Sequence, residues 1–486
     1  MSTTVPETEK PVQGVLEVED VKQSLNTISY TKEEERRTLR KLDFWLVGLL
    51  GSLYLVSYID RSNIGNAYTA GMGKTWGITS NDYSWIITMY YITYILGQPL
   101  ILLWKVVNLP VFVSCIAVGW GAMSMIQAAA NSFAGLMVLR FLIGVFEAGF
   151  GPGVALYYSF WYHRHEQGLR YGLWISFSAL ASCFASALAY GLVQAKAAIA
   201  GWKLLFIVEG APTLLLAVVA YFLLPNGPGQ CRFLNDRENQ IVASRAIRAR
   251  GDDSEKRLNF RQVGSAFYDY KNYLQAAIVF CLNTAFGSLP AFLPTIIEDI
   301  GFTSIKAQGL SAPPYLAAWV VCIAASFASD RLRNRGIFIT ILCLTGGVGY
   351  VLLATVDTVG VRYFGCFLAC IGCFPAVAIT FTWVTDNQGS ASKRGAGLAI
   401  FGMIGQCGPI LGSRIFPTSD GPKYVKGMSI CAGVLFGAAL IAVILSLCLF
   451  LQNRARDKKH GKSSLDHIPV DVTDIGDDHP MYRYVL

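Results

Sequence analysis

Residues 44–67 read FWLVGLLGSLYLVSYIDRSNIGNA, an apolar run that ends near a pair of opposite charges, Asp60 and Arg61. The run is long enough for a helix to cross a bilayer, which takes about 20 residues for roughly 30 Å of hydrocarbon. Similar runs recur along nearly the whole chain. Apolar residues make up 53% of the 486 residues and charged residues only 15%, against about 25% charged in soluble domains. The sequence therefore predicts an all-α membrane protein.

Twelve apolar runs are long enough to be membrane spans. The polar segment 226–271 separates the sixth run from the seventh, so the sequence predicts two six-helix bundles, 42–225 and 272–451, joined by a loop. Residues 1–41 and 452–486 are then an N-terminal and a C-terminal tail. The expected spans cover residues 42–68, 82–104, 109–129, 133–158, 169–193, 203–224, 272–297, 306–328, 337–356, 361–384, 395–415 and 428–451.

Basic residues gather in the connections that fall on one side of the predicted membrane. Cytosolic loops carry an excess of Lys and Arg, so we expect both tails and the 226–271 loop to be cytosolic, in a multi-pass protein of the plasma membrane. The net charge of +8 then reflects topology, and no nucleic-acid partner is expected. The basic residues are Arg36, Arg37, Arg40, Lys41, Arg164, Arg170, Arg331, Arg333, Arg335, Lys393 and Arg394.

Motifs for covalent chemistry are not found in the sequence. It contains no GxxxxGK[ST], HExxH or GxSxG pattern. The segment YHRHEQ at 162–167 places two histidines beside a glutamate, but in a short basic loop, where solvated side chains are expected rather than the three or four ligands of a metal site. The sequence predicts neither an enzyme nor a metal or cofactor site.

Two of the predicted spans, 42–68 and 133–158, each carry an acid and a base well inside the apolar run. A charge at that depth costs about 2.5–3.5 kcal/mol on insertion scales, so it usually faces water or a partner. Besides Asp60 and Arg61, the run at 133–153 carries Arg140 and Glu147, about two turns apart on one helical face. We expect two acids and two bases to share one cavity. The alternative is a structural network, Asp60 with Arg140 or Arg61 with Glu147, that locks the helices together.

Two motifs resemble those of the major facilitator superfamily. RFLIGVFEAGFGPG at 140–153 is similar to the fourth-helix motif of that superfamily, and ASDRLRNRG at 328–336 resembles its basic loop motif. The resemblance implies the twelve-helix major facilitator fold and a gating loop that contains Asp330, Arg331 and Arg335. The corresponding first-half loop, LLWKVVNLP, lacks the usual Asp and Arg pair and keeps only Lys105.

Further stretches resemble the anion:cation symporter family, in particular its fungal allantoate-permease-like members. They are YIDRSNIGNA, YYSFWYHRHEQGLRYG, GWKLLFIVEGAPTLL, FLPTII and WVTDNQGSASKRGAGLAIFGMIGQCGPILGSRIF. The resemblance implies a monomeric transporter that takes up a small organic anion such as a carboxylate vitamin or ureido acid, driven by the proton gradient without a cofactor. It also implies that Asp60 and Glu147 bind the coupling protons, that Arg61 binds the anion and that Arg140 partners the acids.

The residue chemistry agrees with these roles. Arg61 is planar and permanently charged, so it can hold a carboxylate with two parallel hydrogen bonds. Tyr94, Asn283 and Gln406 are further candidates for substrate binding, although polar residues in spans also join helices to one another. A proton-driven exporter or exchanger and a nutrient-sensing receptor with little flux remain the alternatives.

Overall fold

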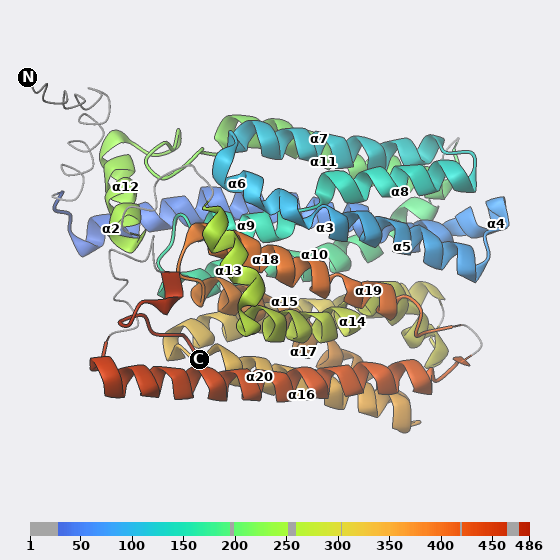
Figure 1. The fold of residues 1–486 in the computed structure, drawn as a ribbon. Helices are drawn as coiled ribbons and strands as arrows, with labels where there is room; N and C mark the ends of the chain where they lie inside the picture. The colour runs from blue at the N-terminus through green and yellow to red at the C-terminus, as the bar shows by residue number, and fades with distance from the viewer. Residues whose placement is uncertain (1–27, 195–198, 251–258, 303, 418–419, 464–475) are drawn as a thin grey trace, which may run out of the picture.

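Helices packed side by side make up most of the described part of the protein, which contains no strand (Figure 1). The computed structural model describes residues 28–194, 199–250, 259–302, 304–417, 420–463 and 476–486. Most of the predicted N-terminal tail, residues 1–27, therefore lies outside the described residues. The rest of that tail forms α2 (Lys32–Leu42), which begins with a capping box between Thr31 and Glu34.

The first half of the chain supplies the helices on one side of the molecule. α2 continues without a break through η1 (Asp43–Val47) into α3 (Gly48–Ala67). The remaining elements of this half are η2 (Tyr68–Met72), α4 (Gly73–Trp76), α5 (Ser80–Leu96), η3 (Gln98–Leu102), α6 (Leu103–Val106), α7 (Leu109–Ile126), η4 (Gln127–Ala129), α8 (Phe133–Glu147), α9 (Phe150–Tyr158), α10 (Arg164–Gln194) and α11 (Gly201–Leu223).

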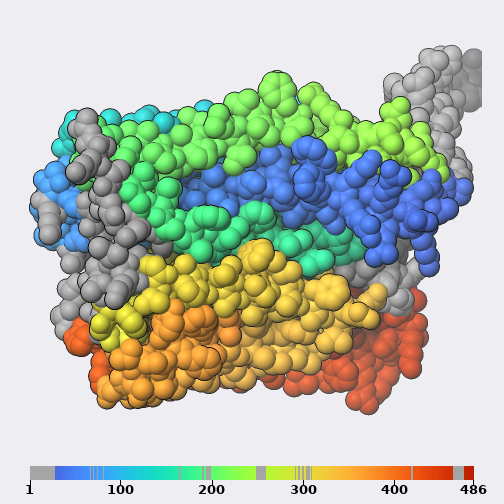
Figure 2. Space-filling model, turned by 180° about the vertical axis from the view of Figure 1, so that it is seen from behind, coloured from blue at the N-terminus to red at the C-terminus, as the bar shows by residue number. Residues whose placement is uncertain are grey.

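The second half forms a matching bundle. In both Figure 1 and Figure 2 the blue-to-green N-terminal helices lie on one side and the yellow-to-red C-terminal helices on the other. This arrangement is the predicted pair of bundles. The C-terminal helices are α14 (Tyr270–Asp299), α15 (Ser304–Leu332), α16 (Arg335–Thr355), α17 (Val359–Asp386), α18 (Ala391–Gly405), α19 (Cys407–Gly412) and α20 (Val425–His460).

Eleven of the twelve expected spans are long and apolar enough to cross a membrane. Ten are helices that meet this description singly, and the bent pair Asn81–Leu96 and Gln98–Val106 makes the eleventh, by length and composition of the described residues. The remaining expected span, 169–193, corresponds to α10, which has 31 residues and packs against α3, α15 and α17. Its residues 173–190, LWISFSALASCFASALAY, are likewise an uncharged and largely apolar run.

The central segment is more ordered than the predicted loop. It contains α12 (Asp236–Arg250) and α13 (Phe260–Tyr268). Ion pairs tie α12 to the N-terminal bundle: Lys41 Nζ lies 2.5 Å from a carboxylate oxygen of Glu238, and Arg245 Nη2 lies 2.6 Å from one of Glu166. The last helix also differs from expectation, because α20 continues past residue 451 to His460.

Besides the bent second span, two further spans are broken near the middle of the molecule. α8 ends at Glu147, and Gly149, with φ of 75°, starts α9 from a left-handed conformation that side chains with a Cβ rarely adopt. A Cβ at Gly149 would also lie 3.1 Å from the backbone nitrogen of Ile101. In the other bundle, α18 gives way to α19 at Gln406, and Pro409 follows. Broken helices of this kind border the binding sites of many transporters.

Candidate functional site

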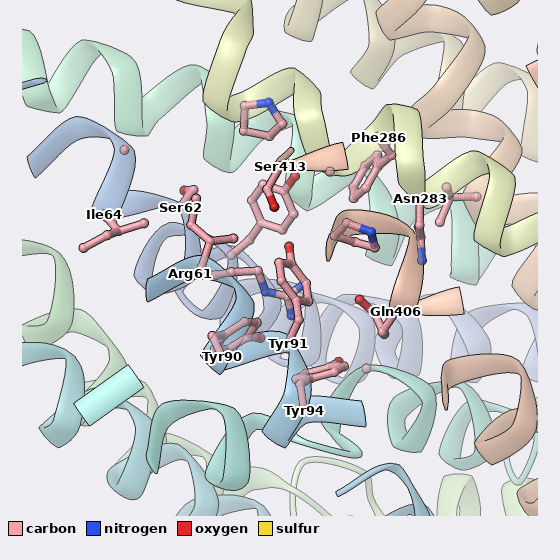
Figure 3. Close-up of a pocket in the computed structure, with 18 of the residues that line it drawn as sticks. Arg61, Ser62, Ile64, Tyr90, Tyr91, Tyr94, Asn283, Phe286, Gln406 and Ser413 are labelled. Atoms are coloured by element: carbon pink, nitrogen blue, oxygen red, sulfur yellow. The ribbon is translucent and has the colours of Figure 1, made fainter. Parts of the chain in front are cut away.

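A cavity of about 1090 Å³, including the part open to solvent, lies between the two bundles. Its N-terminal wall comes from α3, α5, α8, α9 and α10, and its C-terminal wall from α14, α17 and the α18–α19 break. Figure 3 shows Arg61 and the tyrosines of α5 facing Asn283, Phe286 and Gln406 across this space. The lining includes Tyr54, Tyr58, Arg61, Ser62, Tyr83, Tyr90, Tyr91, Tyr94, Arg140, Trp174, Asn283, Phe286, Phe381, Gln406, Pro409 and Ser413.

Arg61 is the cationic group at the centre of the N-terminal wall, and it is paired with Glu147. Its Nη2 donates to Glu147 Oε1 at 2.6 Å. The same oxygen accepts from the Ser57 hydroxyl at 2.5 Å, and the Tyr90 hydroxyl donates to Oε2 at 2.7 Å. Three donors therefore hold the Glu147 carboxylate in place, and this side chain lies behind Arg61 rather than in the lining. The side-chain Nε of Arg61 makes no hydrogen bond within the described part.

Tyrosine rings surround the Arg61 guanidinium. Its central carbon lies 5.1 Å from the ring centroid of Tyr94, 5.3 Å from that of Tyr90 and 5.9 Å from that of Tyr58. Cation–π attraction of this kind is worth about 0.5–1 kcal/mol at exposed sites and about 2 kcal/mol when the cation is desolvated. The rings fix the guanidinium and leave aromatic faces beside it. A flat anion would find both a charge partner and a stacking surface here.

Asp60 does not share this cavity, so the expectation that two acids and two bases line one space is wrong. Its two carboxylate oxygens accept hydrogen bonds of 2.7 Å from Ser124 of α7 and Thr213 of α11. Consecutive residues of a helix point about 100° apart, so Asp60 faces α7 and α11 while Arg61 faces the cavity. The Asp60 side chain is fully buried.

Arg140 lines the cavity and is almost completely buried, as predicted. Its Nη2 donates to Asn63 Oδ1 at 3.1 Å and its Nη1 to the backbone oxygen of Arg61 at 3.3 Å. No ion pair of Arg140 with an acid is found within the described residues. Of the two structural pairings that the sequence suggested, Arg61 with Glu147 is therefore present, and Asp60 with Arg140 is absent from the described part of the chain.

The other three predicted binding residues do line the cavity. Tyr94 is stacked beside Arg61, as described above. Asn283 uses its side-chain nitrogen to donate to the backbone oxygen of Gly405 at 3.1 Å, at the C-terminal end of α18. Gln406, half-buried at the α18–α19 break, lines the same wall. These side chains stand on opposite bundles and would contact different ends of a bound molecule.

The predicted gating loop joins the bundles at the end of the molecule where α12 and the C-terminus lie (Figure 1). Asp330 accepts hydrogen bonds from the backbone nitrogens of Gly168 and Leu169, at 3.1 and 2.5 Å, near the N-terminal end of α10. Arg335 pairs with Asp330 at 2.5 Å and with Asp386 at 3.2 Å. Arg331 is exposed and lies outside this network. The bundles are thus clasped on this side.

The end of the C-terminal tail packs against the same network. The backbone nitrogen of Arg335 donates to the oxygen of Leu486, and the indole of Trp383 donates to the oxygen of Val485 at 2.9 Å. The hydroxyl of Tyr482 donates to the backbone oxygen of Asp386 at 2.9 Å. The sequence predicted only a C-terminal tail here. In the structure residues 482–485 of that tail are buried beside Arg335 and Asp386.

Asp477 anchors the tail between two lysines. Its carboxylate lies 2.8 Å from Nζ of Lys271 and 2.5 Å from Nζ of Lys393. Burial disfavours the charged carboxylate, but the two ammonium groups outweigh burial and hold the pKa of Asp477 at about 2, below its usual value. The tail is therefore held by ionised groups throughout the physiological pH range.

Sequence reasoning missed Glu209 and the tyrosine cage. Glu209 is an acid inside the apolar stretch FIVEGAPTLL, and the rule that singled out the other intramembrane charges applies to it equally. The cage has a signal in spacing: Tyr54 and Tyr58 are one turn apart, as are Tyr90 and Tyr94, so each pair occupies one helical face.

Comparisons with known proteins bear on this geometry. The sequence profile of the Major Facilitator Superfamily matches residues 50–413. The "Major facilitator-type transporter hxnP" of Emericella nidulans is 31% identical over 467 residues, covering 93% of this chain and 94% of the relative. The "High-affinity nicotinic acid transporter" of Saccharomyces cerevisiae is 31% identical over 459 residues, covering 93% and 85%.

Solved structures share the fold. The proton:xylose symporter XylE, bound to 6-bromo-6-deoxy-D-glucose, aligns with a TM-score of 0.64 over 85% of this chain and 95% of that chain, at 14% identity. Two helical bundles around a central cavity, each with a broken helix beside it, are an arrangement found in membrane transporters. The chain belongs to the major facilitator superfamily and is a multi-pass membrane transporter, not an enzyme.

Proposed function

We propose that the protein takes up a small organic anion together with protons, and that the favoured substrate is a planar carboxylate held by Arg61. The observation that carries this proposal is the Arg61 guanidinium inside its cage of tyrosines, at 5.1–5.9 Å from three rings. The guanidinium provides the charge and the donors for a carboxylate, while the rings provide stacking for a flat body. The likeness to a relative named as a nicotinic acid transporter supports the same substrate class.

Coupling to protons would come from competition for Arg61. In the structure its Nη2 is bonded to Glu147 at 2.6 Å. A substrate carboxylate that approaches the guanidinium weakens this pair and leaves a buried carboxylate with less compensation. An uncompensated buried charge is costly, so Glu147 would take up a proton as the anion binds. Release of the anion restores the pair and expels the proton.

The remaining polar residues of the cavity would select the substrate. Asn283 and Gln406 lie across the cavity from Arg61 (Figure 3). There they would contact the end of the substrate that projects away from Arg61. Amide side chains there can donate to or accept from a ring nitrogen, hydroxyl or second carbonyl. Tyr94 and Arg140 would border the carboxylate end.

The proposed setting is the plasma membrane, with the protein acting as a monomer and with both termini and the 226–271 segment in the cytosol. The excess of Lys and Arg in the corresponding connections supports this orientation. In that orientation the clasp of Asp330, Arg335 and the C-terminal tail lies on the cytosolic side. Proton-driven uptake needs this clasp to open and close once in each cycle.

Uptake of radiolabelled nicotinic acid by permease-deficient yeast tests the proposal, with nicotinamide as the matched compound that lacks a carboxylate. We expect accumulation of the acid, none of the amide, and loss of accumulation when a protonophore removes the proton gradient. A panel of aliphatic, ureido and sugar acids tests the breadth of the substrate class. Net efflux of a preloaded acid against its gradient would indicate an exporter, and saturable binding without flux would indicate a receptor. Either result refutes the proposal, and so does a lack of accumulation of every acid in the panel.

A further inference from the structure

Glu209 is a buried acid that the mechanism above does not use. It lies on α11 with 2% of its surface exposed, and neither of its carboxylate oxygens has a hydrogen-bond partner within the described part of the chain. Thr213, one turn further along α11, donates to Asp60 at 2.7 Å. Residues one turn apart share a helical face, so Glu209 faces the same space, where Asp60 and Asn63 are its electrostatic neighbours.

The charges buried in the N-terminal bundle do not balance. Arg61 is matched by Glu147 at 2.6 Å. The remaining groups are the acids Asp60 and Glu209 and the base Arg140, which uses its Nη2 on Asn63 instead of an acid. With every group ionised, this cluster would carry one negative charge in excess. Burying an uncompensated charge costs several kcal/mol, and such a group normally becomes neutral instead.

Hydrogen bonding indicates which acid is neutral. Asp60 accepts from two hydroxyl groups, Ser124 and Thr213, and donors of this kind stabilise the ionised form. Within the described residues neither oxygen of Glu209 has a formed hydrogen bond, and Asn63 is the polar side chain nearest in effect to it. Glu209 is therefore the acid expected to hold the proton in this conformation, with Asp60 as the neighbouring carboxylate that can receive it.

We propose that Glu209 and Asp60 together form a proton-binding site on the side of α3 that faces away from the substrate cavity. This inference rests on the proposed function. Arg140 connects the site to the cavity, because it lines the cavity and also reaches Asn63 beside the two acids. A bound anion that draws Arg140 toward the cavity lowers the positive potential at the acids and favours proton uptake there.

The surroundings favour a proton over a metal ion. The charged groups near Asp60 are Glu209, Arg140 and Glu147. α7 and η4 contribute Ser124 and Gln127, which do not titrate. Within the described residues, no group of three or more His, Cys, Asp or Glu side chains could hold a metal ion. Two neighbouring carboxylates can share a proton without further ligands.

The test compares Glu209→Gln and Glu209→Asp with Glu33→Gln, a matched control on the exposed face of α2. Glutamine mimics the neutral acid, so Glu209→Gln should reach the membrane in normal amounts and exchange internal for external substrate within about twofold of wild type. Its proton-driven accumulation should fall at least tenfold. Glu209→Asp should keep accumulation but with a shifted pH profile, and Glu33→Gln should match wild type.

The outcomes separate this inference from the proposed function. If wild type shows no proton-driven uptake, the proposed function fails. If wild type accumulates substrate and Glu209→Gln does so equally, with an unchanged pH profile, Glu209 is not a proton site. Loss of the folded protein in Glu209→Gln would mean that the ionised acid is structural, which also overturns the inference. If replacing external sodium by choline abolishes accumulation in wild type, the coupling ion is sodium rather than a proton, and the inference is again overturned.

Discussion

Replacement of Arg61 by lysine separates the shape of the guanidinium from its charge. The lysine ammonium can still pair with Glu147, which now lies 2.6 Å from Nη2, so the buried acid stays compensated and the protein should fold. It cannot also present parallel donors to a carboxylate. Loss of one charge-assisted hydrogen bond costs about 1.5–3 kcal/mol. At about 1.4 kcal/mol for each factor of ten, substrate affinity should fall about 10- to 100-fold.

The assay is equilibrium binding of a planar carboxylate to purified protein, together with uptake by cells at matched surface abundance. Arg331→Lys is the control, because Arg331 is exposed at the end of α15 and lies outside both the cavity and the clasp. Unchanged affinity in Arg61→Lys would show that Arg61 only holds the helices together. Loss of the folded protein would likewise contradict the expectation that lysine compensates Glu147.

The remaining predictions concern coupling, orientation and the tail. In Glu147→Gln, which cannot ionise, net uptake should collapse while exchange of internal for external substrate survives; accumulation at wild-type level would exclude Glu147 as a coupling site. Tags at Met1, within 226–271 and at Leu486 should resist external protease in intact cells, and cleavage of any tag would overturn the orientation. Asp477→Asn should lower the free energy of unfolding by about 3 kcal/mol, because two buried lysines lose an acid. The pKa of Asp477 is held at about 2, so its stabilisation is complete above the usual Asp pKa near 4 and is lost only as pH falls through about 2. The difference in thermal unfolding between wild type and Asp477→Asn should therefore be constant from pH 5 to 8. A difference that vanishes at pH 7 would contradict this.

Hydropathy alone predicts most of the fold, because a helix in lipid must carry about 20 apolar residues whatever its neighbours are. α7 matches the expected start at residue 109 for this reason, and α16 begins within a few residues of its expected start. Polar segments outside the predicted spans carry no such signal. The polar ends, α2 and α12, are held by ion pairs that no hydropathy profile contains.

The candidate site is predictable in composition but not in arrangement. Charge inside an apolar run identifies Asp60, Arg61, Arg140 and Glu147, yet it does not say which pairs form. The answer depends on helix rotation: Asp60 points toward hydroxyls on α7 and α11, while Arg61 points toward Glu147. Docking of the tail is harder still, because Leu486 meets Arg335 across a long separation in sequence and no local pattern marks the contact.

The central claim, that anion entry is coupled to proton entry, is tested most directly in vesicles that contain only the purified protein and a trapped pH indicator. The internal and external pH are set equal, at a value where nicotinic acid is fully ionised. Nicotinic acid is then added outside, and internal pH and substrate uptake are followed together. The account predicts that the interior acidifies in step with uptake, and that Arg61→Lys slows both equally. Uptake without acidification would contradict the account.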